Sequence, residues 1–473
     1  MHIYDFITDE IQYGLKNRAI QETRSGRFEE VLKKYKTIFL GEFDKLNISD
    51  DVQNLSNHLK DEKQVTDWFE CFLKVVSADI KAIDKIFDEV LKSYNLFNRS
   101  KHYLSVLKMH DLLEYFDLLR PAHFSKIGAF YRGRPIKYKD NTWRVDEGID
   151  CRDRRPYFHI PFNLRRVLGN QRFSFSGIPI LYIGSSVMTV YYELRETDLN
   201  SKKVGISQYG CNQLVQYDIN RELYNVKEKD NFFDITNDIF DLVNDVFYRL
   251  IEGKIKISAC DDKGSYPGKA ELIISFRRLI LSHLCTFPRI NNSAFSEEYV
   301  IPQILTEAVK IHKFDGILFP STQFGSEKKI EIRSDWKYHT FKYNLAIFTE
   351  YSEIFDYDNS ILDNFYLTVL DLNNYNSTDF KTLKTTIEED LKECTKRLTG
   401  RVDGYHNKRT TLIIEHIYKK IRLYEALFID DQNYLETFAG KVELLYLRKY
   451  IDLSLGKALQ HIPPKDSGTE TLF

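Results

Sequence analysis

Apolar residues recur every three to four positions over the first 120 residues, which is the spacing of one helix face. In SADIKAIDKIFDEVLKSYN this stripe consists of Ile80, Ile83, Phe87, Val90 and Tyr94. HYLSVLKMHDLLEYFDLL repeats the pattern, and Gly and Pro are scarce, as a helix bundle requires. We therefore expect residues 1–120 to form a helical domain whose stripes pack in its core.

The pattern changes between about 121 and 350, where Gly and Pro concentrate and apolar runs shorten. These runs predict strands at Ile178–Ile183, Leu214–Tyr217, Gly316–Phe319 and Tyr343–Phe348. Helical patterns lie between them, at 238–253 and 270–284. A further helix is expected to begin at Pro302 and to face inward with Ile304, Leu305, Ala308, Val309 and Ile311. The segment predicts a mixed α+β domain.

From 351 onward the pattern is helical again. KRTTLIIEHIYKKIRLYEALF has one stripe, formed by Ile417, Ile421, Tyr424 and Phe428. The tail HIPPKDSGTETLF has a Pro pair and polar residues, and we expect it to be loosely ordered. The predicted organisation is an α+β domain at 121–350 between helical domains at 1–120 and 351–473.

Composition excludes several classes of protein. The net charge is −2, so no global field attracts nucleic acid or a membrane. No apolar run approaches the roughly 18–20 residues that span a bilayer, and MHIYDFITDE lacks the basic start and apolar stretch of a signal peptide. The six cysteines form no CxxC pair, which argues against a zinc site and a disulfide framework. We expect a cytoplasmic protein without a metal site.

Arginine is concentrated in one short stretch. Residues 132–172 hold eleven Lys/Arg and five Asp/Glu, a net charge of +6 within 41 residues. A guanidinium matches two phosphate oxygens at once, so this stretch is a candidate site for a phosphate or pyrophosphate. A solvated basic face and a nucleic-acid surface are the alternatives that charge alone leaves open. No GxGxxG or GxxxxGK[ST] loop is present, which speaks against Rossmann or P-loop chemistry.

Four motifs in order along residues 130–322 resemble the RES domain family. They are FYRGRP, PYFHIPFNLRRV, QRFSFSGIPILYIGSSVMTVYYELRE and EEYVIPQILTEAVKIHKFDGILFPST. The Arg, Glu and Ser that give the family its name fall on Arg132, Glu193 and Ser321. The resemblance implies an ADP-ribosyltransferase-like fold and a bacterial toxin that consumes NAD by phosphorolysis, by hydrolysis or by transfer of ADP-ribose to a protein.

The resemblance also implies roles for individual residues. Glu193, Arg132 and Ser321 would be catalytic, and Arg132, Arg172, Tyr182 and Ser321 would bind NAD, which is a substrate here and not a prosthetic group. Cleavage of nicotinamide from ribose develops positive charge on the sugar, and a carboxylate such as Glu193 stabilises that charge. We expect Glu193 in the first turns of a helix, and a supporting structural role for Tyr299 and Gln303.

Other interpretations remain open. Glu193 could be a surface acid beside Arg195, and Arg132 could belong to a solvated basic strand. Tyr182 could be a core residue, and Ser321 could cap the end of a strand. In that case the domain would be a non-catalytic scaffold. Protein ADP-ribosyltransferases often carry Glu-x-Glu, whereas Glu193 and Glu196 have two residues between them, which favours phosphate or water as acceptor. A HEPN-type ribonuclease would use Arg-x(4–6)-His, a rule that Arg409/His416 and Arg154/His159 meet.

Residues 1–120 and 351–473, called here the helical arms, lie outside the family motifs and must have a separate function. The minimal toxins of the family are paired with an antitoxin, and this chain is much longer, so a defence effector with a phage-derived trigger is one expectation. Long amphipathic helices commonly pack against a partner subunit, so we expect a homo-oligomer. We also expect the arms to control the enzyme without contributing to its active site.

Overall fold

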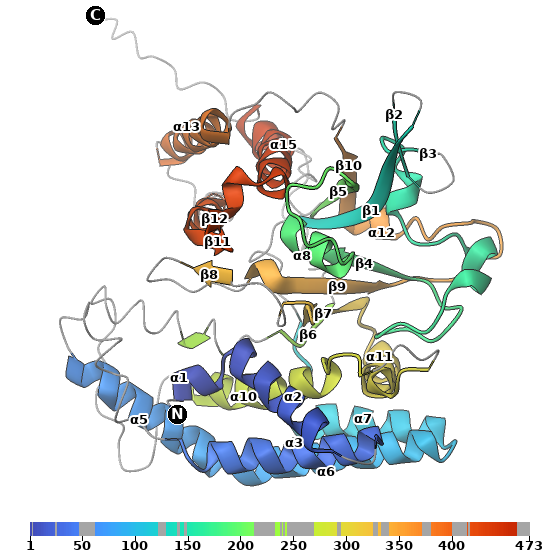
Figure 1. The fold of residues 1–473 in the computed structure, drawn as a ribbon, viewed down its shortest axis with the longest axis vertical. Helices are drawn as coiled ribbons and strands as arrows, with labels where there is room; N and C mark the ends of the chain where they lie inside the picture. The colour runs from blue at the N-terminus through green and yellow to red at the C-terminus, as the bar shows by residue number, and fades with distance from the viewer. Residues whose placement is uncertain are drawn as a thin grey trace, which may run out of the picture.

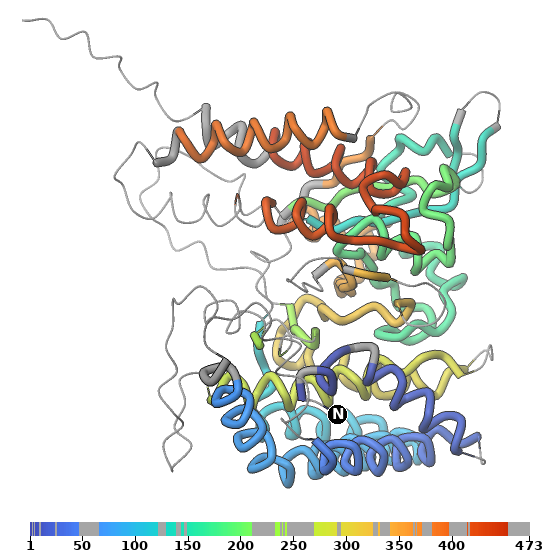
Figure 2. The backbone as a smooth tube through the Cα atoms, turned by 60° about the vertical axis from the view of Figure 1, so that its left-hand side comes forward, coloured from blue at the N-terminus to red at the C-terminus, as the bar shows by residue number. Residues whose placement is uncertain are grey.

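The computed structural model shows a central β-sheet between two groups of helices. The N-terminal helices lie on one side of the sheet and the C-terminal helices on the other, in both views (Figures 1 and 2). The structure describes residues 1, 3–23, 26–46, 62–121, 129–139, 142–145, 149–211, 232–236, 239, 242–243, 269–290, 295–324, 330–332, 340–370, 380–399, 414 and 417–460. This arrangement is the mixed α+β fold expected from the sequence.

The N-terminal region is helical, as its periodicity predicts. Its described helices are α1 (Ile3–Phe6), α2 (Asp9–Glu22), α3 (Phe28–Phe43), α5 (Glu62–Ala78), α6 (Ile80–Asn98) and α7 (His102–Tyr115). The stripe of α6 is buried at Ile83, Phe87, Val90 and Tyr94, which confirms the predicted helix and its inner face. Burial of such a stripe supplies most of the stability of an amphipathic helix.

The sheet runs in the order β10-β5-β1-β4-β9-β7-β6. Its strands are β1 (Ala129–Lys139), β4 (Ile180–Gly184), β5 (Val204–Cys211), β6 (Phe232–Asp234), β7 (Gly316–Pro320), β9 (Tyr343–Phe348) and β10 (Phe365–Val369). Neighbours pair antiparallel except β6 and β7, which are parallel. β2 (Thr142–Val145) and β3 (Ile149–Asp150) extend β1 as a small antiparallel ribbon. β1 is therefore an interior strand, with β4 on one side and β5 on the other.

Successive side chains of a strand point to opposite faces of the sheet, so residues of one strand belong to different hydrophobic cores. Ile180 of β4 joins a core made with the N-terminal helices, whereas Leu181 and Ile183 join another. The first core also contains residues of α10 (Lys269–Cys285) and α11 (Val300–Ile311). The N-terminal helices therefore share one continuous core with helices of the middle segment.

The C-terminal region is only partly helical. It contains α12 (Ile361–Asn364), α13 (Phe380–Thr399), α15 (Phe438–Gln460) and the 3₁₀ turn η9 (Tyr434–Glu436). Contrary to the expectation of a helical region after 351, β10 joins the central sheet, and β11 (Leu427–Ile429) and β12 (Gln432–Asn433) form a second sheet with β8 (Ile330–Ile332). Ile417, Ile421 and Tyr424 are buried as predicted, but Phe428 belongs to β11 and not to the helix.

Several predicted boundaries change in the structure. β4 begins at Ile180, and Ile178 is exposed. α11 begins at Val300, so Pro302 is its third residue, and Ile311 is exposed because it ends the helix. The predicted strand at 214–217, most of the helix at 238–253 and the tail lie outside the described residues.

The structure also bears on the predictions from composition. Within the described residues, no helix has the length and apolarity that crossing a membrane requires. The cysteine spacing predicts no disulfide framework, yet Cys71 is disulfide-bonded. Cys151, Cys285 and Cys394 are free and buried.

Candidate active site

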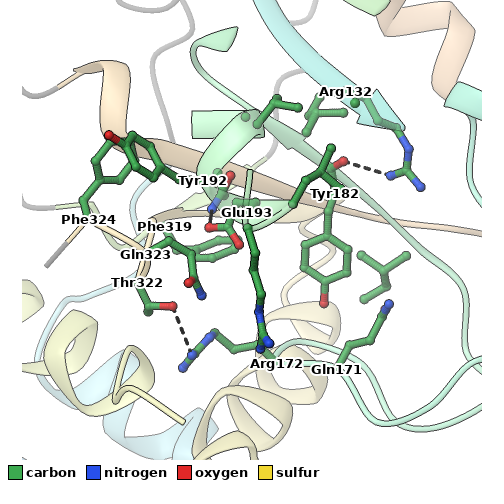
Figure 3. Close-up of a pocket in the computed structure, with 18 of the residues that line it drawn as sticks. Arg132, Gln171, Arg172, Tyr182, Tyr192, Glu193, Phe319, Thr322, Gln323 and Phe324 are labelled. Carbon is green, nitrogen blue, oxygen red and sulfur yellow. Dashed lines mark hydrogen bonds between the residues drawn. The ribbon is translucent and has the colours of Figure 1, made fainter. Parts of the chain in front are cut away.

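A cavity of about 960 Å³ opens beside the middle of the sheet. Four of the five residues that the sequence singled out line it, namely Arg132, Arg172, Tyr182 and Glu193 (Figure 3). Ser321 does not line it, although the neighbouring Thr322 does. Its volume lies in the range of roughly 300–1,000 Å³ that is typical of ligand sites. Residues 132 to 322 are thus brought to one site from strands, a helix and two loops.

Arg132 lies on the interior strand β1, opposite Ser207 of β5. Its Nη1 donates a hydrogen bond to the carbonyl of Tyr182 at 2.9 Å, and its buried Nε has no hydrogen-bond partner among the described residues. Burial lowers the pKa of Arg132 to about 9, and repulsion from Arg134 adds to this effect. The guanidinium still carries its charge at neutral pH. A desolvated cation with a free donor is a site for an anion.

The turn Gly184-Ser185-Ser186 places the helix that carries Glu193. Ser186 caps α8 (Val187–Glu193) by accepting a hydrogen bond from the Thr189 N–H at 3.0 Å. α8 crosses β1 at Gly133, where a Cβ would lie 2.3 Å from Cγ1 of Val190. Only glycine permits this close approach. Glu193 is the last residue of this seven-residue helix, so it lies in the second turn, in agreement with the expectation that it lies in the first turns of a helix.

Glu193 is held by two donors. Its Oε1 accepts hydrogen bonds from Ser321 Oγ at 2.5 Å and from Asn344 Nδ2 at 2.6 Å. A carboxylate at a helix C-terminus is disfavoured by the helix dipole, and these two donors offset that effect. Glu193 itself is exposed to the cavity, so the carboxylate is oriented and remains accessible to a ligand.

Asn344 is a site residue that the sequence reasoning missed. It lies on β9 between Gly184 of β4 and Phe319 of β7, and it is buried. The available signal was a polar residue inside the apolar strand YNLAIF. Buried polar side chains within strands commonly have a specific hydrogen-bond partner, and here the partner is Glu193.

Arg172 joins two elements at the edge of the cavity. Its Nη1 donates to the carbonyls of Cys285 and Phe287, both at 3.0 Å, at the C-terminal end of α10. Its Nη2 lies 3.4 Å from Thr322 Oγ1, and the guanidinium lies over the Tyr299 ring at 5.0 Å. Part of its hydrogen-bonding capacity is therefore structural.

Tyr182 presents its ring to the cavity. Its hydroxyl accepts a hydrogen bond from the Phe173 N–H at 3.1 Å, and burial raises the pKa of this hydroxyl. The ring meets Phe319 edge-on at 6.5 Å between centroids. Tyr182 can therefore offer an aromatic surface, while its hydroxyl holds the loop that carries Arg172.

Gln303 of α11 fixes that loop from behind. Its Nε2 lies within hydrogen-bond distance of the Asn170 side chain and of the carbonyls of Gln171 and Ser174, at 2.7–3.0 Å. Tyr299, under the Arg172 guanidinium, supports the same loop. The contacts of Tyr299 and Gln303 hold the loop in place, which is the supporting structural role expected for these two residues from the sequence.

Positive charge dominates the cavity lining. Among the described lining residues, Glu193 is the only carboxylate, whereas the basic residues are Arg132, Arg134, Arg172, Arg195, Arg289 and Lys342. Such a lining attracts anionic ligands.

The two predicted nuclease pairs differ in what the structure shows. His159 is buried, its Nδ1 lies 2.8 Å from the Ile160 carbonyl, and its Nε2 accepts from the Asp358 N–H at 2.8 Å. Burial also lowers the pKa of His159. Both nitrogens are thus occupied by the backbone, which argues against Arg154/His159 as a nuclease pair. Arg409 and His416 lie outside the described residues.

Both helical arms contact the site, contrary to the expectation that it is confined to the middle segment. Tyr13 of α2 lines the cavity. From the other side, Lys420 Nζ donates to the Ser185 carbonyl at 3.2 Å, and Glu443 Oε2 accepts from the Val187 N–H at 3.0 Å. The C-terminal region therefore holds the turn and the first residue of α8.

Comparison with protein-family models gives no match, and no solved structure matches the chain. A curated protein of Bacillus subtilis (strain 168), named "Putative toxin YopC", is 30% identical over 156 residues. The aligned region is 32% of this chain and 29% of that protein. The chain thus spans less than a third of its relative, and the similarity is to a protein named as a toxin.

Proposed function

We propose that the protein is a toxin or defence effector that cleaves the nicotinamide–ribose bond of NAD. The observation that carries the proposal is the charge of the cavity. The Arg132 guanidinium is desolvated with a free Nε, and Glu193 is the only carboxylate among the described lining residues. The resemblance to RES domains and the name of the Bacillus subtilis relative support the same function.

In this proposal Arg132 binds the pyrophosphate, assisted by Arg172, and Tyr182 offers its ring to the nicotinamide. The bond between C1 of the ribose and the nicotinamide nitrogen breaks, and nicotinamide leaves with the bonding electrons as a neutral base. Glu193, oriented by Ser321 and Asn344, stabilises the positive charge on the sugar. An oxygen of phosphate or water then forms the new bond to C1, and water loses a proton to the solvent.

The contacts of Glu196 favour a small acceptor over a protein side chain. Its carboxylate accepts hydrogen bonds from the Asp198 N–H at 3.1 Å and from Ser201 Oγ at 3.1 Å. It is engaged in its own loop and is not among the residues that line the cavity. Without a second carboxylate to orient a protein acceptor, phosphorolysis or hydrolysis is the better match, and transfer of ADP-ribose to a protein is the alternative.

Product identification tests this function directly. The purified protein is incubated with NAD, with and without inorganic phosphate, and the products are separated and weighed by mass spectrometry. If phosphate is the acceptor, we expect nicotinamide and a phosphorylated ADP-ribose only in the sample that contains phosphate. If water is the acceptor, we expect nicotinamide and ADP-ribose in both samples. Unchanged NAD under both conditions would refute the proposal.

Expression in cells separates the NAD-cleaving function from the nuclease. We expect cellular NAD to fall as growth stops, and neither Arg409→Ala nor His416→Ala to prevent it. Growth arrest with constant NAD and cleaved RNA, abolished by either substitution, would establish the nuclease in its place.

A further inference from the structure

Two histidines and a glutamate meet where the N-terminal helices pack on α11, away from the cavity. His110 and Glu114 are one turn apart on α7, so their side chains share a face. His312 is the C-terminal cap of α11. α7 and α11 pack against each other, and both contribute to the same core.

The geometry brings one potential ligand atom from each residue within 4.8 Å of the others. The two imidazole rings stack at 4.4 Å between centroids, with planes 10° apart. His110 Nε2 lies 3.7 Å from Glu114 Oε1. Ligand atoms at roughly 2.0–2.2 Å from one tetrahedral ion lie about 3.4 Å apart, so the three ligand atoms would have to approach one another by up to about 1.4 Å. Glu114 is exposed, so its side chain is free to move inward.

One buried nitrogen of each histidine lacks a hydrogen-bond partner among the described residues. His110 Nδ1 and His312 Nε2 are buried, and neither has a hydrogen-bond partner among the described residues. A buried imidazole nitrogen without a partner is costly, and native structures rarely keep one without a reason. Two such atoms, on facing helices and in stacked rings, point to a missing ligand with affinity for imidazole.

We propose that His110, Glu114 and His312 bind one divalent transition-metal ion, with Zn²⁺ as the best match. Two imidazoles and a carboxylate form a ligand set that Zn²⁺ prefers, and an exposed Glu114 leaves the fourth position to water. Asp111 Oδ1 lies 3.5 Å from His110 Nδ1, so a further acid stands close to the cluster without belonging to the three ligands.

The two imidazole ligands should make metal binding depend on pH. A neutral imidazole binds metal and an imidazolium does not. Binding should therefore weaken below neutral pH, as protons compete for the two rings.

A bound ion would join the N-terminal helices to α11, the helix that leads into β7 and the Ser321 segment. An ion that binds the folded chain and not the unfolded chain raises the midpoint of thermal unfolding. The ion would therefore stabilise the contact between the N-terminal helices and the segment that carries the candidate site, without contacting the cavity.

Metal titration of the full chain tests the proposal. Chelator-treated protein in a phosphate-free buffer is titrated with Zn²⁺ by calorimetry, its thermal unfolding is followed with and without the ion, and Co²⁺ spectra report the coordination. We expect one ion per chain, an unfolding midpoint higher by roughly 2 °C or more, and the intense visible bands of tetrahedral Co²⁺.

The variants decide whether these residues are the ligands. His110→Gln combined with His312→Gln should abolish binding, and Glu114→Gln should weaken it by about tenfold. His102→Gln, on an exposed position of the same helix, should bind as the wild type does. Glu114 is exposed, so its variant should fold even if the double variant does not. Unchanged affinity in Glu114→Gln and in the double variant, or no binding by the wild type, would overturn the proposal.

Discussion

At the scale of single residues, Arg132 and Glu193 carry opposite charges and differ in how strongly their charges are desolvated. Arg132 is desolvated, so its charge costs free energy until an anion binds. Glu193 is exposed and held by two donors, so its charge is available at little cost. We therefore expect Arg132 to act on binding and Glu193 on rate.

Glu193→Gln should lower the turnover of NAD by about 10²–10³ while leaving the dissociation constant nearly unchanged. The amide oxygen can still accept from Ser321 and Asn344, so the fold is preserved, but the charge that opposes the cationic transition state is lost. Steady-state kinetics and calorimetric binding measure the two quantities separately. Retention of more than about a tenth of the wild-type turnover would contradict the assignment.

Arg132→Ala should weaken NAD binding by roughly ten- to a hundredfold, as expected when a hydrogen bond to a charged group is lost. Its free energy of unfolding should fall little, because removal of a desolvated charge offsets the loss of packing. Calorimetry and denaturant unfolding measure the two effects. Arg166→Ala, an exposed arginine that does not line the cavity, is the control and should bind NAD normally. Equal binding by both variants would refute the role of Arg132.

At the scale of elements, the contact between β1 and α8 places Glu193. A Cβ at position 133 would come within 2.3 Å of Val190 Cγ1 and 2.9 Å of Leu194 Cδ1. Val190 is buried and β-branched, so it has little freedom to move.

Gly133→Ala should therefore displace α8 and separate Glu193 from Ser321 and Asn344. We expect a loss of about 1–3 kcal/mol of stability from overpacking and a fall in turnover of up to about 10²-fold, since catalytic groups tolerate little displacement. Gly169→Ala is the matched control, because a Cβ there has no atom within 4 Å. Full activity of Gly133→Ala would show that the added methyl group does not displace Glu193, and would contradict the prediction.

At the scale of the whole molecule, the arms and the middle segment are packed as one body. The N-terminal helices share their core with α10 and α11, and Tyr13 reaches the cavity. On the other side, the buried carboxylate of Glu443 accepts from the Val187 N–H at 3.0 Å, from the Tyr434 hydroxyl at 2.6 Å and from the Tyr424 hydroxyl. Both arms therefore make buried contacts with the middle segment.

Glu443→Leu should destabilise the full chain by at least about 2 kcal/mol, because it keeps the volume but leaves buried donors without their acceptor. NAD turnover should fall as well, since the first residue of α8 loses its anchor. Denaturant unfolding and steady-state kinetics provide the measurements. Glu436→Gln, at an exposed position of η9, should change stability by less than about 0.5 kcal/mol. Wild-type stability of Glu443→Leu would show that the arm does not hold α8.

The sequence by itself determined the local elements and singled out most of the candidate site residues. Periodicity is a property of neighbouring residues, so α6 and β7 could be predicted from their apolar positions alone. The ordered motifs also singled out Arg132, Glu193 and Ser321, and the last two are in contact in the structure.

Tertiary structure alone decided which distant residues meet. Asn344 reaches Glu193 because β9 pairs with β4, and β10 joins the sheet through pairing with β5. His110 and His312 carry no local motif, and only the packing of α7 on α11 stacks their rings. Such contacts depend on strand order and helix packing between segments far apart in the chain, and local periodicity contains no information about that choice.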